Sequence, residues 1–379
     1  MMLLVAFLAS FAIYYIEMKL FRHLWEKGLS VDILFLQKGI NAGQTGVIRE
    51  TVSNSKRLPL PILEVKFATA PSFLFEKERI TSVTDRFYKK DLFSLRGRQR
   101  TVIYHEFKAM KRGYFSIDEI DVLTKDYFFS QEYAVRVKND TAIYVYPMKL
   151  DTHILNPFFA RMMGDVVTRR RMEEDLFAFR GIREYHPGDS MRRINWKNTA
   201  HTGNLLVNVY ETTTAVEVCL LLDQRIRLPF DEEEISEELI ALASSVSSWL
   251  LESGISVELY SNYTDIVTRE PVTVTDGVGR GHIARIDRAL ARADKKVCGP
   301  DLEELLREQV QIHGKKKCYL VLSSDYTTEF LELLMAYQRQ KTAVYAIMPY
   351  SSRSLKKIQK TGLMEHRNMI YPWCAEVAK

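Results

Sequence analysis

Hydrophobic and polar positions follow two different patterns along the chain. Residues 28 to about 150 form short runs in which β-branched and aromatic residues alternate with polar ones, separated by turn formers. From about Thr212 onward, continuous apolar runs of strand length alternate with longer segments of helical periodicity. The first pattern predicts an all-β sandwich, and the second predicts a doubly wound α/β sheet with helices on both faces.

The two patterns assign elements to most of the chain. In the first region we predict strands and interpret the basic tract at residues 86–100 as a solvated loop, with contact to anionic lipid as the alternative. The predicted strands there are residues 31–37, 45–52, 60–68, 101–109, 114–122 and 141–146. In the second region the predicted strands are residues 216–222, 256–260, 318–322 and 343–348, and the predicted helices are residues 232–252, 282–293, 302–313 and 328–339.

An apolar run opens the chain. Residues 1–16 read MMLLVAFLASFAIYYI, and Lys19, Arg22 and Lys27 follow them. Sixteen residues fall short of the ~20 that cross a bilayer, but snorkelling side chains over residues 17–25 can extend the span. No basic residues precede the run and no cleavage site follows it, which argues against a secretory signal. We predict a single transmembrane helix that places the body of the protein in the cytoplasm.

Turn formers, charges and a tryptophan are concentrated in residues 179–197, FRGIREYHPGDSMRRINWK. Pro187 and Gly188 predict a tight turn. Asp189 then stands where an N-cap begins a short helical turn. Arg192 and Trp196 are four residues apart and are expected to share a face.

This segment resembles the signature of a bacterial family termed domain of unknown function 58. The matching residues are Arg183, Tyr185, Pro187, Gly188, Asp189, Arg192, Ile194, Trp196 and Ala200, whereas Asn195 replaces an acidic residue and His201 an arginine. The resemblance implies a membrane-linked protein with an immunoglobulin-like sandwich and a von Willebrand A-like domain. It also implies a MoxR-type AAA+ ATPase as the partner.

The signature segment admits three interpretations. In the first, Arg183, Arg192 and Asp189 form a buried ion-pair network, and Trp196 fills a gap between two domains. In the second, the segment is a docking surface, because Trp, Tyr and Arg are enriched at interface hot spots. A catalytic role is the third, but no nucleophile, base and orienting group stand at workable spacing, so we expect no catalytic residues.

A metal site is the main chemical question in the second region. Asp223 and Asp325 follow predicted strands, at the edge where ligands bind in such sheets. The von Willebrand A site uses an Asp-x-Ser-x-Ser run for Mg²⁺, but here Arg225 and Arg227 replace both serines. A guanidinium has no lone pair to donate to a cation. We therefore predict a degenerate site without metal, in which Arg225 pairs with Asp223 or Asp325.

Composition restricts the remaining possibilities. The net charge of +5 arises from 53 basic and 48 acidic residues, which does not indicate nucleic acid as a partner. The four cysteines are scattered without C-x-x-C spacing, which argues against a disulfide framework or a zinc site. We expect no cofactor.

We therefore expect four segments. They are a transmembrane helix with its juxtamembrane part (residues 1–27), the sandwich (28–150), a linker with the signature (151–211) and the α/β domain (212–379). The leading hypothesis is a non-enzymatic adaptor or assembly factor that lies in the cell membrane and works with a MoxR-type ATPase on envelope proteins. A structural scaffold of the cell envelope without an ATPase is the alternative, and a hydrolase that uses Asp223 and Asp325 is the third.

Overall fold

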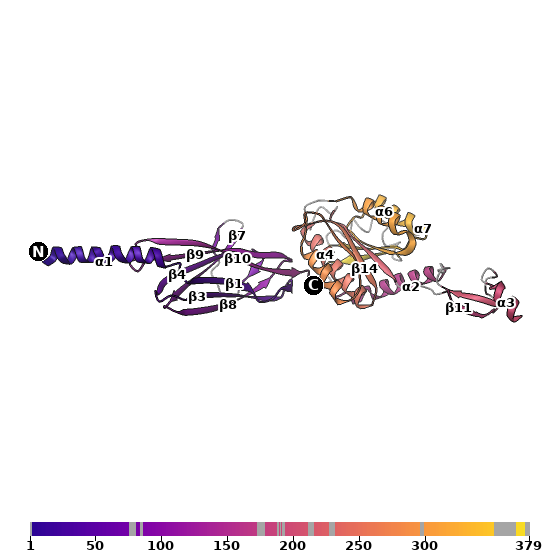
Figure 1. Ribbon diagram of the computed structural model, residues 1–379. Coiled ribbons are helices and arrows are strands. Elements are labelled where there is room, and N and C mark those ends of the chain that lie inside the picture. The colour runs from indigo at the N-terminus through magenta and orange to yellow at the C-terminus, as the bar shows by residue number, and fades with distance from the viewer. Residues whose placement is uncertain are drawn as a thin grey trace. The chain divides into compact units, whose positions relative to one another are not determined.

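The computed structural model describes residues 2–75, 81–83, 86–172, 179–187, 189, 191, 194–210, 216–226, 232–295, 299–351 and 369–375. The chain divides into two compact units, Met1–Met148 and Lys149–Lys379 (Figure 1).

The first unit contains a β-sandwich, as its alternating pattern predicts. One sheet has the order β1 (Leu29–Phe35), β3 (Thr45–Asn54), β8 (Gln99–Ala109) and β5 (Phe73–Leu74). The other has the order β2 (Gly39–Asn41), β10 (Glu132–Tyr146), β9 (Gly113–Lys125), β4 (Leu60–Thr69), β7 (Arg86–Leu95) and β6 (Thr81–Val83). Alternate residues of these strands are buried in one apolar core, among them Ile33, Ile48, Val65, Phe107 and Ile120.

The basic tract at residues 86–100 is not a solvated loop. Its first part is strand β7, which pairs with β4 in antiparallel register, and its end begins β8. Lys89 and Phe93 are buried, while Lys90 and Leu92 between them are exposed, so every second side chain faces the interior. The sequence pattern does not predict this strand, because a lysine and an aspartate occupy two of its inward positions.

Helix α1 (Met2–Leu24) is attached to the sandwich by its C-terminal half. Phe21 and the following Trp25 are buried in the sandwich core. The ring centroid of Phe21 lies 5.6 Å from that of Tyr127, and the Tyr127 amide donates to Glu17 Oε1 at 3.2 Å. The loop after β9 therefore holds the helix in place, and Figure 1 shows α1 projecting from the end of the sandwich.

The N-terminal half of α1 exposes its large apolar side chains. Leu4, Val5, Phe7, Leu8, Phe11, Ile13 and Ile16 are all exposed. The predicted transmembrane segment is thus a helix with an apolar first half, but no helix in the described part of the chain is both long and apolar enough to cross a membrane.

The second unit contains a mixed α/β domain around a largely parallel sheet. The strand order is β15 (Pro271–Gly277), β14 (Ser256–Asp265), β13 (Glu217–Leu222), β17 (Cys318–Leu322), β18 (Val344–Tyr350) and β19 (Ile370–Cys374), and β16 (Ala293–Asp294) pairs with β14. All neighbours from β14 to β19 are parallel, whereas β15 runs antiparallel to β14. The helices are α4 (Glu232–Glu252), α5 (Arg280–Ala291), α6 (Leu302–His313) and α7 (Thr328–Arg339). Figure 1 shows α6 and α7 together on one side of the sheet and α4 on the other.

Helix α2 (Asn156–Met172) lies in the segment assigned to a linker, yet it contributes to the core of the α/β domain. Phe158, Met162 and Val166 recur every four residues and are buried. The ring of Phe159 stacks on Trp249 of α4, with centroids 4.2 Å apart. A basic C-terminal end of the helix masks this short apolar stripe in the sequence.

Candidate functional site

The signature segment folds into a small structure of its own, the signature arm (residues 179–210). Strand β11 (Phe179–Glu184) pairs in antiparallel register with β12 (Leu206–Tyr210) as a separate two-stranded sheet, and Ile194 forms a bridge to Val207. Both Ile194 and Val207 are buried, but neither belongs to the core cluster of the sandwich or of the α/β domain. The arm therefore has a hydrophobic centre of its own.

A tight turn forms where Pro187 and Gly188 predict it. The Asp189 amide donates to the carbonyl of His186 at 3.0 Å, which closes a four-residue turn around these two residues. Gly188 itself lies outside the described residues.

The carboxylate of Asp189 is held by the strand before the turn. Arg183 donates from both terminal nitrogens to the two oxygens of Asp189, at 2.7 Å each, and the His186 amide donates at 2.9 Å. The hydrogen bonds from Arg183, followed by that from His186, hold the pKa of Asp189 well below its usual range. The predicted N-cap role of Asp189 involves the segment that follows it, where residues 190, 192 and 193 lie outside the described residues, so this role stays a prediction.

The Arg183–Asp189 pair of the clasp interpretation is present, but it is not buried. The Arg183 side chain is 46% exposed and that of Asp189 is 13% exposed, so the pair lies at the surface. Trp196 is 65% exposed. Arg192 lies outside the described residues, and so do its proposed ion pair and the face that it was expected to share with Trp196.

Asn195 joins the start of α3 (Trp196–Thr202) to the arm's sheet. Its side-chain oxygen accepts from the Asn198 amide at 3.0 Å, which is an N-cap, while its amide nitrogen donates to Asn208 Oδ1 at 2.8 Å. The backbone amide of Asn195 also donates to the Leu206 carbonyl at 2.8 Å. A carboxylate at this position can cap the helix but cannot donate to Asn208, so the departure from the family pattern has a local structural use.

The arm presents several large apolar side chains to solvent. Trp196 stands at the first position of α3, immediately after the cap, and Tyr185 is half-buried with its amide bonded to the Leu205 carbonyl. The exposed apolar residues of the arm are Ile182, Met191, Trp196 and Leu205. Such residues on a framework fixed by backbone hydrogen bonds are suited to contact with another protein.

The edge of the α/β sheet brings Asp223 and Asp325 to neighbouring strand ends, as predicted. Asp223 follows β13 and Asp325 follows β17, and both are buried. Asp223 accepts from Asn262 Nδ2 at 2.9 Å, from Ser323 Oγ at 2.7 Å and from the Arg225 amide at 3.1 Å. Burial raises the pKa of Asp223, and these three donors oppose that rise. Neutral donors therefore satisfy the carboxylate that is a metal ligand in the von Willebrand A pattern.

The expected pairing of Arg225 with Asp223 or Asp325 is wrong. Only the backbone amide of Arg225 reaches Asp223, and its guanidinium forms an ion pair with Asp301 instead. The side chains of this pair are 41% and 53% exposed, because the chain after β13 directs Arg225 outward. Arg227 lies outside the described residues.

A polar cluster that sequence analysis missed lies inside the sandwich. His105 Nε2 lies 2.9 Å from Glu50 Oε2 and 3.6 Å from Asp91 Oδ2, and Lys89 Nζ lies 4.0 Å from Asp91. Burial, then the charge of Asp91, raises the pKa of Glu50 to about 9, and burial, then the charge of Lys89, lowers the pKa of His105 to about 4. Charged residues at the inward positions of alternating strands are the signal that could have revealed this cluster.

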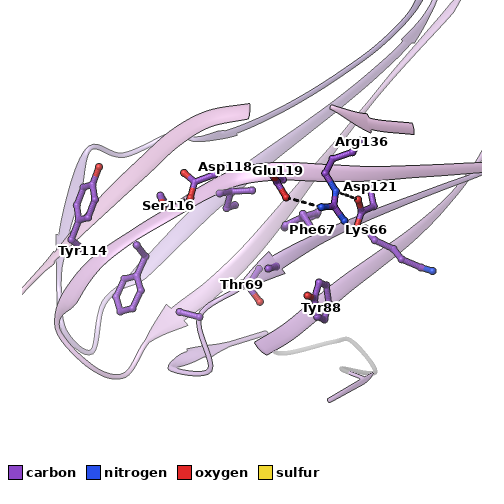
Figure 2. Close-up of a pocket in the computed structure, with 14 residues that line it drawn as sticks. Lys66, Phe67, Thr69, Tyr88, Tyr114, Ser116, Asp118, Glu119, Asp121 and Arg136 are labelled. Atoms are coloured by element: carbon purple, nitrogen blue, oxygen red, sulfur yellow. Dashed lines mark hydrogen bonds and ion pairs between the residues drawn. The ribbon is translucent and has the colours of Figure 1, made fainter. Parts of the chain in front are cut away.

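A shallow groove of about 570 Å³ lies on the second sheet of the sandwich (Figure 2). Figure 2 shows Arg136 directed toward two acidic side chains: its Nε lies 2.7 Å from Asp121 and a terminal nitrogen lies 3.2 Å from Glu119. None of the residues predicted as site residues lines the groove. Arg136 is thus paired with two acidic residues that line the groove, and Lys66 is paired with Glu64.

Comparison with known proteins finds low similarity to solved structures and a family model that matches the second half of the chain. Among solved structures, a CARDB domain of the PF1109 protein from Pyrococcus furiosus is similar at 11% identity over 31% of this chain and 94% of that chain, with a TM-score of 0.21. A non-cellulosomal cohesin from Archaeoglobus fulgidus is similar at 8% identity over 31% and 91%, with a TM-score of 0.23. No curated protein matches the chain. The sequence model of a family described as "Protein of unknown function DUF58" matches residues 181–365. Through residues 181–365, which include most of the signature arm together with Asp223 and Asp325, the chain belongs to the DUF58 family.

Proposed function

We propose that this protein is a non-enzymatic, membrane-attached adaptor or assembly factor whose signature arm binds a MoxR-type AAA+ ATPase, and that the two act together on envelope proteins. The observation that carries the proposal is the exposure of Trp196 on an arm whose two-stranded sheet is separate from the sheet of the α/β domain. The family resemblance supplies the identity of the ATPase and of the clients.

The arm has the properties of a prepared contact surface. Tryptophan contributes more binding energy at interfaces than most residues, provided that it becomes buried against a partner. Here Trp196 is the first residue of α3, directly after the N-cap residue. The Arg183–Asp189 pair fixes the turn that precedes this helix. A surface that is ordered before binding loses less conformational entropy when the complex forms.

Attachment to a membrane is supported by helix α1. Its exposed apolar side chains, from Leu4 to Ile16, are a surface that soluble proteins seldom leave in water. We propose that residues 1–16 contact the lipid bilayer and that Lys19, Arg22 and Lys27 hold the body on the cytoplasmic side. The sandwich then stands next to the membrane, because Phe21 and Trp25 join α1 to its core.

The α/β domain, which we take to be von Willebrand A-like, is proposed to act as a rigid support without a catalytic metal. The hydrolase hypothesis needs Asp223 as a free base or metal ligand, but three donors already bind its oxygens. A structural scaffold without an ATPase remains the second candidate, and the same arm would then bind an envelope protein.

The test is affinity purification of the full-length protein from its own membranes, with ATP hydrolysis blocked. We compare the wild type with Trp196→Ala and with Ile312→Ala, a control at an exposed apolar residue of α6 outside the arm. We expect the ATPase to copurify with the wild type and the control but not with Trp196→Ala. Equal recovery from all three, or no ATPase in any of them, favours the scaffold.

A further inference from the structure

Three potential metal ligands meet between the two sheets of the sandwich. Glu50 comes from β3 and His105 from β8 in one sheet, and Asp91 comes from β7 in the other. Their ligand atoms all lie within 4.8 Å of one another. Because the three strands belong to facing sheets, the cluster is a property of the folded sandwich and not of one loop.

The spacing of these atoms suits a common cation. Bonds of about 2.0–2.2 Å from nitrogen and oxygen ligands to Zn²⁺ place the ligand atoms of a tetrahedral site roughly 3.3 Å apart. The distances from His105 Nε2 to Glu50 Oε2 and to Asp91 Oδ2, 2.9 Å and 3.6 Å, lie on either side of that value. Small side-chain movements would therefore bring the three atoms to a shared ion.

A second observation points into the same cluster. Glu50 is completely buried, and its Oε1 atom accepts no hydrogen bond among the described residues. A buried carboxylate oxygen without a donor is costly, and such groups in proteins are usually paired or coordinate a metal. The Asp91 side chain as a whole is 16% exposed, although its Oδ2 atom, which faces the cluster, is buried.

We propose that Glu50, Asp91 and His105 bind a divalent transition-metal ion, with Zn²⁺ as the reference ion, and that this ion links the two sheets of the sandwich. An imidazole with two carboxylates suits Zn²⁺ and Mn²⁺. The inference concerns the sandwich alone and does not depend on the proposed binding of an ATPase by the arm.

Lys89 is the neighbour that opposes a cation. Its ammonium lies 4.0 Å from Asp91 Oδ2 and 5.0 Å from the ring centroid of Phe75. A positive charge at this distance weakens the binding of an ion to the same carboxylate. Removing that charge while keeping the apolar stem, as in Lys89→Met, is therefore expected to tighten binding by roughly tenfold or more.

The experiment is calorimetric titration of the purified full-length protein, first stripped with a chelator, with Zn²⁺ and separately with Mn²⁺. We expect one ion per chain in the wild type, tighter binding in Lys89→Met, and affinity at least about tenfold weaker in Glu50→Gln and His105→Gln. His201→Gln, at an exposed histidine of α3, is the control and should bind as the wild type does. Circular dichroism reports whether each variant is folded, and Asp91→Asn, at the partly exposed ligand, replaces any variant that is not.

Two results would overturn the proposal. One is the failure of the wild type to bind either ion. The other is unchanged binding in folded variants of the three ligands, which would place the ion elsewhere on the surface. A rise in the melting temperature of the wild type with Zn²⁺ that is absent from Glu50→Gln would independently link the ion to the fold of the sandwich.

Discussion

Arg183 and Asp189 face each other across the turn at Pro187, with both terminal nitrogens of the guanidinium 2.7 Å from the two carboxylate oxygens. The pair connects strand β11 to the chain that leads to Trp196. Two-point pairing fixes direction as well as distance, so the role of this pair is geometric more than energetic.

Replacing Asp189 by Asn should loosen the arm without destabilising the α/β domain. The amide has one accepting oxygen in place of two, so the two parallel hydrogen bonds from Arg183 cannot both be kept in their present geometry and the turn opens more often. Hydrogen exchange should become faster at the His186 and Asp189 amides, while the melting temperature of the α/β domain stays within ~1 °C because an exposed pair contributes little stability. Asp121→Asn, which breaks the exposed Arg136–Asp121 pair of the sandwich, is the control and should leave exchange in the arm unchanged. Unchanged exchange in Asp189→Asn would show that the pair does not hold the turn.

The ionisation of Asp189 should depend on Arg183. The pKa of this carboxyl is lower in the folded arm than its ordinary value of 3.8, mainly through the hydrogen bonds from Arg183. Its contribution to the stability of the arm is therefore fully present above pH 3.8 and is lost only as the pH falls through the lower, folded value. A carboxyl carbon NMR titration should show the midpoint moving upward, toward 3.8, in Arg183→Gln. Equal midpoints in the two proteins would contradict this account.

Replacing Asn195 by alanine should destabilise the start of α3 more than replacing it by aspartate. Asn195→Ala removes the cap of α3, which typically costs ~1 kcal/mol. Asn195→Asp keeps a capping oxygen and loses only the donation to Asn208, so it should cost less. The local opening free energy from hydrogen exchange at Asn198 and Thr199 measures both effects. Equal opening free energies for Asn195→Ala and the wild type would show that this cap does not stabilise α3.

Substitutions at Asp223 and at Arg225 should have very different effects on the stability of the α/β domain. Asp223→Ala leaves Asn262 and Ser323 without their buried partner and should lower the free energy of unfolding of the α/β domain by ~3 kcal/mol. Arg225→Ser breaks an exposed ion pair with Asp301 and should change that free energy by less than ~0.5 kcal/mol. Urea denaturation measures both.

The same two residues test the degenerate metal site. Because Asp223 is already satisfied by three donors, Arg225→Ser should gain no affinity for Mg²⁺ in calorimetry. Binding of Mg²⁺ by Arg225→Ser would show instead that the arginine alone excludes the ion.

Lipid attachment should depend on the exposed half of α1. Phe7→Ser combined with Phe11→Ser replaces two exposed rings, so folding of the sandwich should be unaffected while flotation with liposomes of anionic and neutral phospholipid is reduced. Leu92→Ser, at an exposed residue of β7, is the matched control and should float as the wild type does. Equal flotation of all three proteins would place the lipid contact outside this helix.

Much of the α/β domain is predictable because its elements are long and strongly periodic. The bounds of α4, α6, α7 and β17 agree with the sequence pattern residue for residue. Strand β7 is not predictable in the same way, since the inward Lys89 and Asp91 break its hydrophobic alternation.

At the candidate sites too, features formed by residues close in sequence can be predicted, whereas contacts between residues far apart in sequence cannot. The turn at Pro187 follows from local backbone chemistry. The pairing of Arg183 with Asp189 is one of the interpretations that the sequence suggests, although not its exposure. The partner of Arg225 does not follow from the sequence, because Asp301 reaches it only through the fold. The Glu50, Asp91 and His105 cluster likewise requires the two sheets to face each other.

The most direct test of the proposed function is the dissociation constant between the purified full-length protein and a purified MoxR-type ATPase in its ATP-bound state. For Trp196→Ala we predict binding about 30-fold weaker than for the wild type, as expected for a hot spot of ~2 kcal/mol, with Ile312→Ala unchanged. Equal affinity of the wild type and a folded Trp196→Ala variant, or no measurable binding by the wild type, would contradict the proposal that the arm docks this ATPase.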